Sequence, residues 1–328
     1  MGDHIVGEAH AATAADHTTA WRSWLASPAV RTLAVFLPTA AGFAIAQVDK
    51  GGDARFTTSL EFFVWSGLIA VAVAVWVAMS LGLLPTVREL RSLFGDDGPA
   101  IPVPGLFGIY ALYAAVLFAV LTAGNRPMIP LDHFSFRIRT VFVIGLASAA
   151  PTVVALWLVA ERLRRLRPLL AAGAPLSNAG ERVEELRTLW RCSVRSLAAA
   201  SVAVSLAVVL AGAMRNALVA YDPATWKETF PESGLLLYGA LFTVAFAAVY
   251  MPTLLTWRGR ARQLVDAVYQ TPVDGKPDEA WMKGRTALEQ LLGINIGLMA
   301  QLSGMLAIFG PLAASFLATF VPQLANGQ

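Results

Sequence analysis

Long apolar runs, each close to the length of a membrane-spanning helix, constrain this chain more than any other feature. The hydrocarbon core of a bilayer is about 30 Å thick, and a helix needs roughly 20 apolar residues to cross it. Six runs reach or approach that length, and almost all charged residues fall between them. The first run is the shortest, and Pro38 and Gln47 interrupt it. The six runs cover residues 32–48, 62–84, 106–123, 140–160, 196–214 and 234–257.

The composition agrees with a membrane protein. Charged residues make up 14% of the chain and hydrophobic residues 56%, whereas about 25% of the residues of a soluble domain are charged. Continuous apolar runs with few Asn-Gly or Asp-Gly turn signals favour helices over a membrane barrel. The sequence therefore predicts an all-α, polytopic helical membrane protein with six to seven transmembrane helices.

The final stretch, residues 290–328, contains no charged side chain and predicts either a seventh crossing or a segment that enters the membrane and returns. Small and polar side chains recur along it every three or four residues, so a helix would place them on one face. One interpretation is close helix packing, which Gly293 and Gly297 favour as a GxxxG pattern and for which Ser201 and Ser205 offer a matching surface. The other is the lining of a pore built from several copies. The stripe consists of Asn295, Gly297, Gln301, Gly304, Ile308, Pro311, Ser315 and Thr319.

The basic residues predict the orientation. With the N-terminus inside, 18 Lys and Arg residues fall on the inner side and 7 on the outer side, as the positive-inside rule requires. Most of them are arginine, which fits a GC-rich bacterial genome, and the single Cys192 suits a reducing compartment. We therefore expect a bacterial inner-membrane protein with a cytoplasmic N-terminus. The net charge of +3 reflects this loop asymmetry and does not indicate nucleic-acid binding.

Two long inner connections share one design and predict cytoplasmic helical hairpins. Each consists of a basic continuation of a span, a cluster of Gly and Pro, and a second helical segment; Asp278 is the expected N-cap in the second hairpin. One amphipathic face in each hairpin is a candidate surface for a cytoplasmic protein partner, formed by Val183, Leu186 and Trp190 in the first and by Trp281 and Leu288 in the second. The predicted organisation is a cytoplasmic tail (1–30), four spans (31–160), the first hairpin (161–195), two spans (196–257), the second hairpin (258–289) and the uncharged membrane segment (290–328).

Motifs that carry chemistry are missing from the sequence. It has no HExxH helix and no phosphate-binding loop, and the predicted spans hold no buried Asp, Glu, His or Lys of the kind that couples ion transport. His133 is the only histidine outside the N-terminal tail, and the spacing of the tail histidines matches no closed metal site. We therefore expect no enzyme activity, cofactor or metal.

The leading hypothesis is a self-assembling channel or pore in the lipid bilayer, regulated through its cytoplasmic hairpins. We expect a homo-oligomer. A membrane effector of a defence or stress system would fit this description, although no motif ties the chain to a family. One alternative is a membrane anchor or accessory subunit for a soluble partner. Another is a facilitator for a small uncharged or zwitterionic substrate.

Overall fold

The computed structural model describes residues 28–47, 51–95, 108, 111, 129–171, 178–272, 275–294 and 309–317. Within these ranges the backbone is helical almost throughout and forms no β-strand, which confirms the all-α class. A short helical segment at residues 309–317, here called the C-terminal helix, carries no number. The numbered helices are α2 (Pro28–Gln47), α3 (Ala54–Thr57), α4 (Leu60–Ser92), α6 (Phe134–Ala171), α7 (Ala179–Tyr221), α8 (Pro223–Thr229), α9 (Glu232–Val268) and α10 (Glu279–Leu291).

Four helical stretches are long and apolar enough to cross a membrane. They contain the predicted runs 62–84, 140–160, 196–214 and 234–257. The run at 32–48 corresponds to α2, which belongs to the shorter apolar helices. The run at 106–123 and most of 290–328 lie outside the described residues, so the predicted total of six to seven crossings is not confirmed. The four stretches are Leu60–Ser92, Phe134–Leu170, Ala179–Tyr221 and Pro223–Val268.

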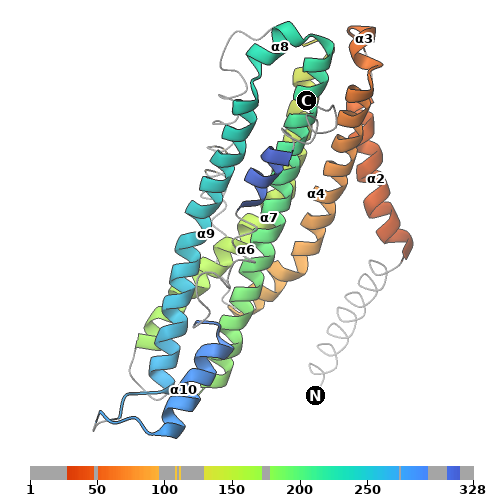
Figure 1. The fold of residues 1–328 in the computed structure, drawn as a ribbon. Helices are drawn as coiled ribbons and strands as arrows, with labels where there is room; N and C mark the ends of the chain where they lie inside the picture. Colours follow the sequence, from red (N-terminus) through yellow and green to blue (C-terminus); the bar gives the residue numbers. More distant parts are fainter. Residues whose placement is uncertain are drawn as a thin grey trace, which may run out of the picture.

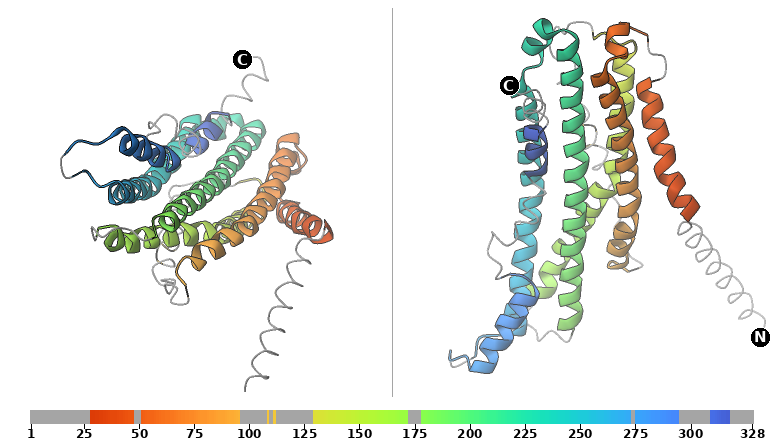
Figure 2. Two further views of the ribbon diagram at one scale, coloured as in Figure 1. Left: turned by 90° about the horizontal axis from the view of Figure 1, so that it is seen from below. Right: turned by 45° about the vertical axis from the view of Figure 1, so that its right-hand side comes forward.

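The long helices stand side by side in a tall bundle, with α2 at one edge against α4 (Figure 1). The end of α6, the start of α7 and α10 lie at one end of the bundle, here called the hairpin end, and α8 lies at the other, here called the α8 end (Figure 1). Helix α6 leans across the bundle, beside α4 nearer the α8 end and beside α9 at the hairpin end (Figure 2). Helix α6 thereby contacts four other helices, α2, α4, α7 and α9.

Small residues and one tryptophan hold the middle of the bundle together. A Cβ atom on Gly42 of α2 would lie 2.8 Å from the Cα atom of Ala70 in α4, so the two backbones are in direct contact. The indole Nε1 of Trp76 in α4 donates a hydrogen bond of 3.0 Å to the carbonyl of Ala203 in α7, and its ring lies against Gly145 of α6. Close backbone approach of this kind is how helices pack where lipid replaces water.

A hydrophobic core at the hairpin end joins α4, α6, α7, α9 and the residues after α10. The rings of Trp190 and Trp257 stack with centroids 4.6 Å apart, and the Trp257 indole donates to the carbonyl of Leu186 over 2.9 Å. Most of these side chains lie beyond the apolar runs, so this core extends past the region that a bilayer would cover. Its fully buried leucines are Leu90, Leu158, Leu163, Leu166, Leu186, Leu189 and Leu264.

The second hairpin folds back onto α9. The Asp278 carboxylate accepts the backbone N–H of Trp281 over 2.6 Å, which confirms Asp278 as the N-cap of α10. The Trp281 indole donates to the Gln270 carbonyl over 3.0 Å, and its ring meets Tyr269 edge to face. These contacts tie the first turn of α10 to the end of α9.

Helix α10 ends in a left-handed turn that returns the chain to the core. Gly293 has φ of +69°, a conformation that glycine adopts without steric cost. The Ile294 N–H bonds to the Glu289 carbonyl over 3.0 Å, and the Ile294 side chain is buried in the hairpin-end core, as in a Schellman cap. The expected GxxxG helix face starting at Gly293 is therefore wrong, because this glycine terminates a helix.

Two buried arginines at the α8 end bind the backbone. Arg137 donates to the carbonyls of Ile45 and Ala46 over 3.1 and 2.7 Å, where the last turn of α2 leaves its carbonyls without helical partners. Arg215 donates to the Phe230 carbonyl over 2.8 Å at the end of α8. A positive charge at a helix C-terminus also complements the helix dipole.

Glu185 is the buried acid of the hairpin end. Its side chain is 6% exposed and accepts hydrogen bonds from Arg162 of α6 and, over 2.7 Å, from Arg182. The Arg162 guanidinium also lies 5.5 Å from the centre of the Phe94 ring. The carboxylate therefore links α6 to α7 beside the residues that follow α4.

We predict that Glu185→Ala lowers the free energy of unfolding by about 3 kcal/mol, because it leaves the half-buried Arg162 without a counter-charge. Glu184→Ala is the matched control: its carboxylate is 58% exposed and pairs with Arg187 and Arg191 at the surface, so we expect a loss of at most about 1 kcal/mol. Chemical denaturation of the detergent-solubilised protein measures both. Equal losses would contradict the structural role of Glu185.

Candidate functional site

The structure places only part of the predicted stripe. Pro311 and Ser315 lie in the C-terminal helix, and both are buried. Helix α10 ends at the Gly293 turn, before the first member of the stripe. Six members of the stripe lie outside the described residues: Asn295, Gly297, Gln301, Gly304, Ile308 and Thr319.

The described part of the stripe packs against α9. A Cβ atom on Gly239 of α9 would lie 2.7 Å from the Cβ of Ser315 and 2.8 Å from the Pro311 carbonyl oxygen. The Ser315 hydroxyl is fully buried and donates to the Leu312 carbonyl over 2.7 Å. Pro311 and Ser315 therefore form a close helix contact at Gly239, the arrangement that the packing interpretation predicts.

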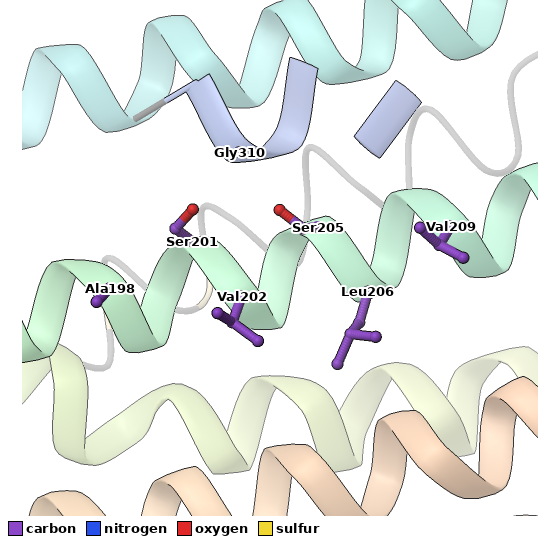
Figure 3. Close-up of a pocket in the computed structure, with 7 residues that line it drawn as sticks. All are labelled: Ala198, Ser201, Val202, Ser205, Leu206, Val209 and Gly310. Carbon is purple, nitrogen blue, oxygen red and sulfur yellow. The ribbon is translucent and has the colours of Figure 1, made fainter. Parts of the chain in front are cut away.

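On the side away from α9, the C-terminal helix contacts α7. Gly310 lies directly on the hydroxyl of Ser201, and a Cβ atom there would lie 3.1 Å from the hydroxyl oxygen of Ser205. Figure 3 shows both hydroxyls pointing from α7 toward Gly310. The small surface that Ser201 and Ser205 were expected to offer thus receives the C-terminal helix. Together the contacts at Gly239 and Gly310 place this helix between α7 and α9.

A groove runs along α7 beside this contact. It has a volume of about 400 Å³, and its walls are apolar apart from the two serine hydroxyls. Val202 and Leu206 line the side of α7 that points away from Gly310 (Figure 3). No charged side chain is among the lining residues, so the groove can accept a neutral or apolar group but offers no proton donor or acceptor stronger than a hydroxyl. Its lining residues are Ala198, Ser201, Val202, Ser205, Leu206, Val209 and Gly310.

Sequence reasoning did not identify most of this groove. It singled out the two serines for packing but not Ala198, Val202 or Leu206, which look like any lipid-facing residues of a span. The spacing of Ala198, Ser201 and Ser205 at three and four residues is the signal that was available, since it places three small side chains on one helical face.

The side chains predicted to bind a partner are packed within the chain. Leu186 has no exposed surface, and Val183, Trp190 and Leu288 pack against the hairpin-end core. Trp281 lies against Tyr269. An amphipathic face indicates that a helix is covered on one side, but not whether the same chain or another covers it. The hairpins remain a predicted partner site.

Polar clusters elsewhere in the described ranges are few. No group of three or more His, Cys, Asp or Glu side chains in that part of the chain lies close enough to hold a metal ion. Near the α8 end, Asp53 caps α3 and accepts hydrogen bonds from Arg55 and from the Tyr221 hydroxyl over 2.6 Å. The hydrogen bond from the Arg55 side chain holds the pKa of Asp53 well below its usual range.

No family model matches the chain, and comparison with curated proteins and with solved structures finds no significant match. The fold and the groove define a class only: a helical protein with four stretches long and apolar enough to cross a membrane, an apolar groove along one of them and a helical hairpin end. A more specific function has to be inferred from the residues themselves.

We predict that Gly239→Ala lowers the melting temperature in detergent, because the new methyl group would overlap Ser315 and the Pro311 carbonyl. Forced overpacking of this kind costs about 1–3 kcal/mol. Gly234→Ala on the same helix is the control: no atom lies within 4 Å of its Cβ position, so stability should stay unchanged or rise slightly with the better helix former. Unchanged stability of Gly239→Ala would show that α9 and the C-terminal helix are not in this contact.

Proposed function

We propose that the protein is a non-enzymatic polytopic protein of the bacterial inner membrane that self-assembles into a channel or pore. The observation that carries this proposal is the uncharged groove along α7, which has hydroxyls on one side and apolar side chains on the other. Because Gly310 covers the hydroxyls of Ser201 and Ser205, the groove is almost wholly apolar, and an apolar constriction can gate a water-filled path.

The incomplete covering of the spans supports self-assembly. In the most apolar part of each of the four stretches, only between 18 and 33% of the residues are buried inside the chain. Helix α9 has the least-buried window and exposes Leu237, Leu241, Val244 and Leu255. Lipid or a second copy of the chain has to cover this face. A second copy could also close the groove along α7.

The distribution of charge supports a cytoplasmic hairpin end. Arginines follow the apolar part of α6 from residue 162 and that of α9 from residue 258, and the positive-inside rule assigns such clusters to the cytoplasm. This orientation also puts the N-terminus in the cytoplasm. Regulation would then act on the hairpin end. The core of the hairpin end includes residues of α7 and α9, and these two helices also hold the C-terminal helix.

A facilitator for a small uncharged molecule is the second candidate, and the groove itself favours it. A volume of about 400 Å³ lies within the range of ligand pockets, and two hydroxyls in an apolar wall suit a neutral solute. A facilitator would move solute into liposomes without an electrical current, whereas a channel would carry current.

We predict that the purified full-length chain produces ion conductance in planar bilayers and that Val202→Trp reduces it severalfold, because the larger side chain fills the groove without touching the Gly310 contact. Leu169→Trp is the control, since Leu169 is exposed near the end of α6, outside both the groove and the exposed face of α9, and wild-type conductance is expected. Single-channel recording measures all three. No current from any of them, together with a monomeric mass in detergent, would refute the channel.

A further inference from the structure

The groove along α7 is open on its apolar side. Val202 is 46% exposed and Ala198 is also exposed, whereas Ser201 is buried beneath Gly310. The lining residues that belong to α7 all fall within the apolar run 196–214, so the open side faces hydrocarbon in a bilayer that this run crosses. An apolar hollow of about 400 Å³ does not hold water stably, and if it were empty its walls would lose dispersion contacts. A hydrocarbon chain is the occupant that satisfies both conditions.

The groove has the length of one lipid acyl chain. Its α7 residues extend from Ala198 to Val209, which corresponds to roughly 16 Å along the helix axis. The hydrocarbon core of a bilayer is about 30 Å thick and consists of two layers of chains, so one layer measures roughly 15 Å. Because α7 begins at the hairpin end (Figure 1), Ala198 lies just inside the limit of the apolar run 196–214 on that side. The groove therefore spans the hairpin-end leaflet from its surface to the middle of the bilayer.

Arg195 of the same helix lies where the headgroup of such a lipid would be. It is exposed, and it precedes Val202 by almost two full helical turns, so the two side chains share one face of α7. It is also the last residue before the apolar run 196–214, and a helical side chain leans toward the N-terminus of its helix, which for α7 is the hairpin end. The guanidinium is therefore placed at the headgroup level. Arg191, one turn farther from the groove, pairs with Glu184 over 3.1 Å.

We propose that the groove along α7 binds one acyl chain of an anionic phospholipid, with the phosphate of its headgroup at Arg195. A planar guanidinium binds phosphate through paired hydrogen bonds, and arginines at the membrane surface attract anionic lipids. The C-terminal helix forms one edge of the site at Gly310, so the chain lies along Ala198, Val202 and Val209. The inference rests on the membrane location in the proposed function: it requires that α7 crosses the membrane, but not that the protein conducts.

The test measures lipid retention by native mass spectrometry of the delipidated full-length chain in neutral detergent, titrated with one of four probes. Phosphatidylglycerol and the single-chain lysophosphatidylglycerol should each add one tightly held molecule per chain with similar affinity, because the groove takes one acyl chain. Phosphatidylcholine, which has the chains but no net charge, should bind about fivefold more weakly, the usual contribution of one arginine to attraction by anionic lipid. Glycerol phosphate, which has the charge but no acyl chain, should not bind.

Two pairs of variants locate the site. Val202→Trp should abolish the tight binding, because the larger side chain fills the groove. Val143→Trp is its matched control, since Val143 is 60% exposed in the apolar run of α6 and lies outside the groove, and it should retain the wild-type affinity. Arg195→Gln should weaken the binding of phosphatidylglycerol about fivefold and leave that of phosphatidylcholine unchanged. Arg262→Gln removes the same charge from an exposed position on α9 and should change neither.

Circular dichroism checks that each variant is folded, and the exposed Arg195 provides a second variant should Val202→Trp fail to fold. Equal losses in Val202→Trp and Val143→Trp would reduce the binding to the general lipid shell and overturn the site. Equal weakening by Arg195→Gln and Arg262→Gln, or equal affinity for the two phospholipids, would overturn the headgroup assignment. No retained phosphatidylglycerol would overturn the proposal, and a multimeric mass in the same spectra would then assign the groove to a second copy. Because the spectra do not measure current, these outcomes are independent of the channel test.

Discussion

The hydrophobic core at the hairpin end is the interaction on which the rest of the structure depends. Apolar side chains attract one another strongly only where they leave water, and within a bilayer helices gain no such attraction because lipid is equally apolar. The core of α4, α6, α7 and α9 lies largely beyond the apolar runs. With the membrane location proposed here, this core is the part of the bundle that the hydrophobic effect assembles, and it sets the order in which the four helices continue into the lipid.

Beyond this core, a second cluster of buried side chains, among them Phe56, Trp65 and Trp226, joins α2, α3, α4, α6, α7 and α8, and close backbone contacts add to it. Gly42, Gly239 and Gly310 let backbones approach until a single methyl group would clash, and Trp76 fastens α4 to α7 with one indole hydrogen bond. These contacts are narrow, and they leave most of each span uncovered. A groove of about 400 Å³ can therefore persist along α7, and the proposed pore and its assembly from several copies both depend on that sparse packing.

Charge is organised by depth along the same helices. At the hairpin end, acids and arginines pair within the chain, with Glu185 buried between two of them. At the α8 end, Arg137 and Arg215 are buried against backbone carbonyls, and Arg215 also pairs with Glu232 over 3.4 Å.

The sequence by itself determined the helical class, four of the apolar stretches, both breaks between hairpin helices and the Asp278 cap. These features were predictable because hydrophobic run length and capping residues act over a few neighbouring positions. It also marked Ser201 and Ser205 as a small surface. Only the tertiary structure decided that Gly310 lies on those serines, that Gly293 ends a helix, and that Leu186 and Trp190 are covered by α9 of the same chain. An amphipathic or small face has the same sequence pattern whatever covers it, and the covering segment is fixed by contacts between residues far apart in the chain.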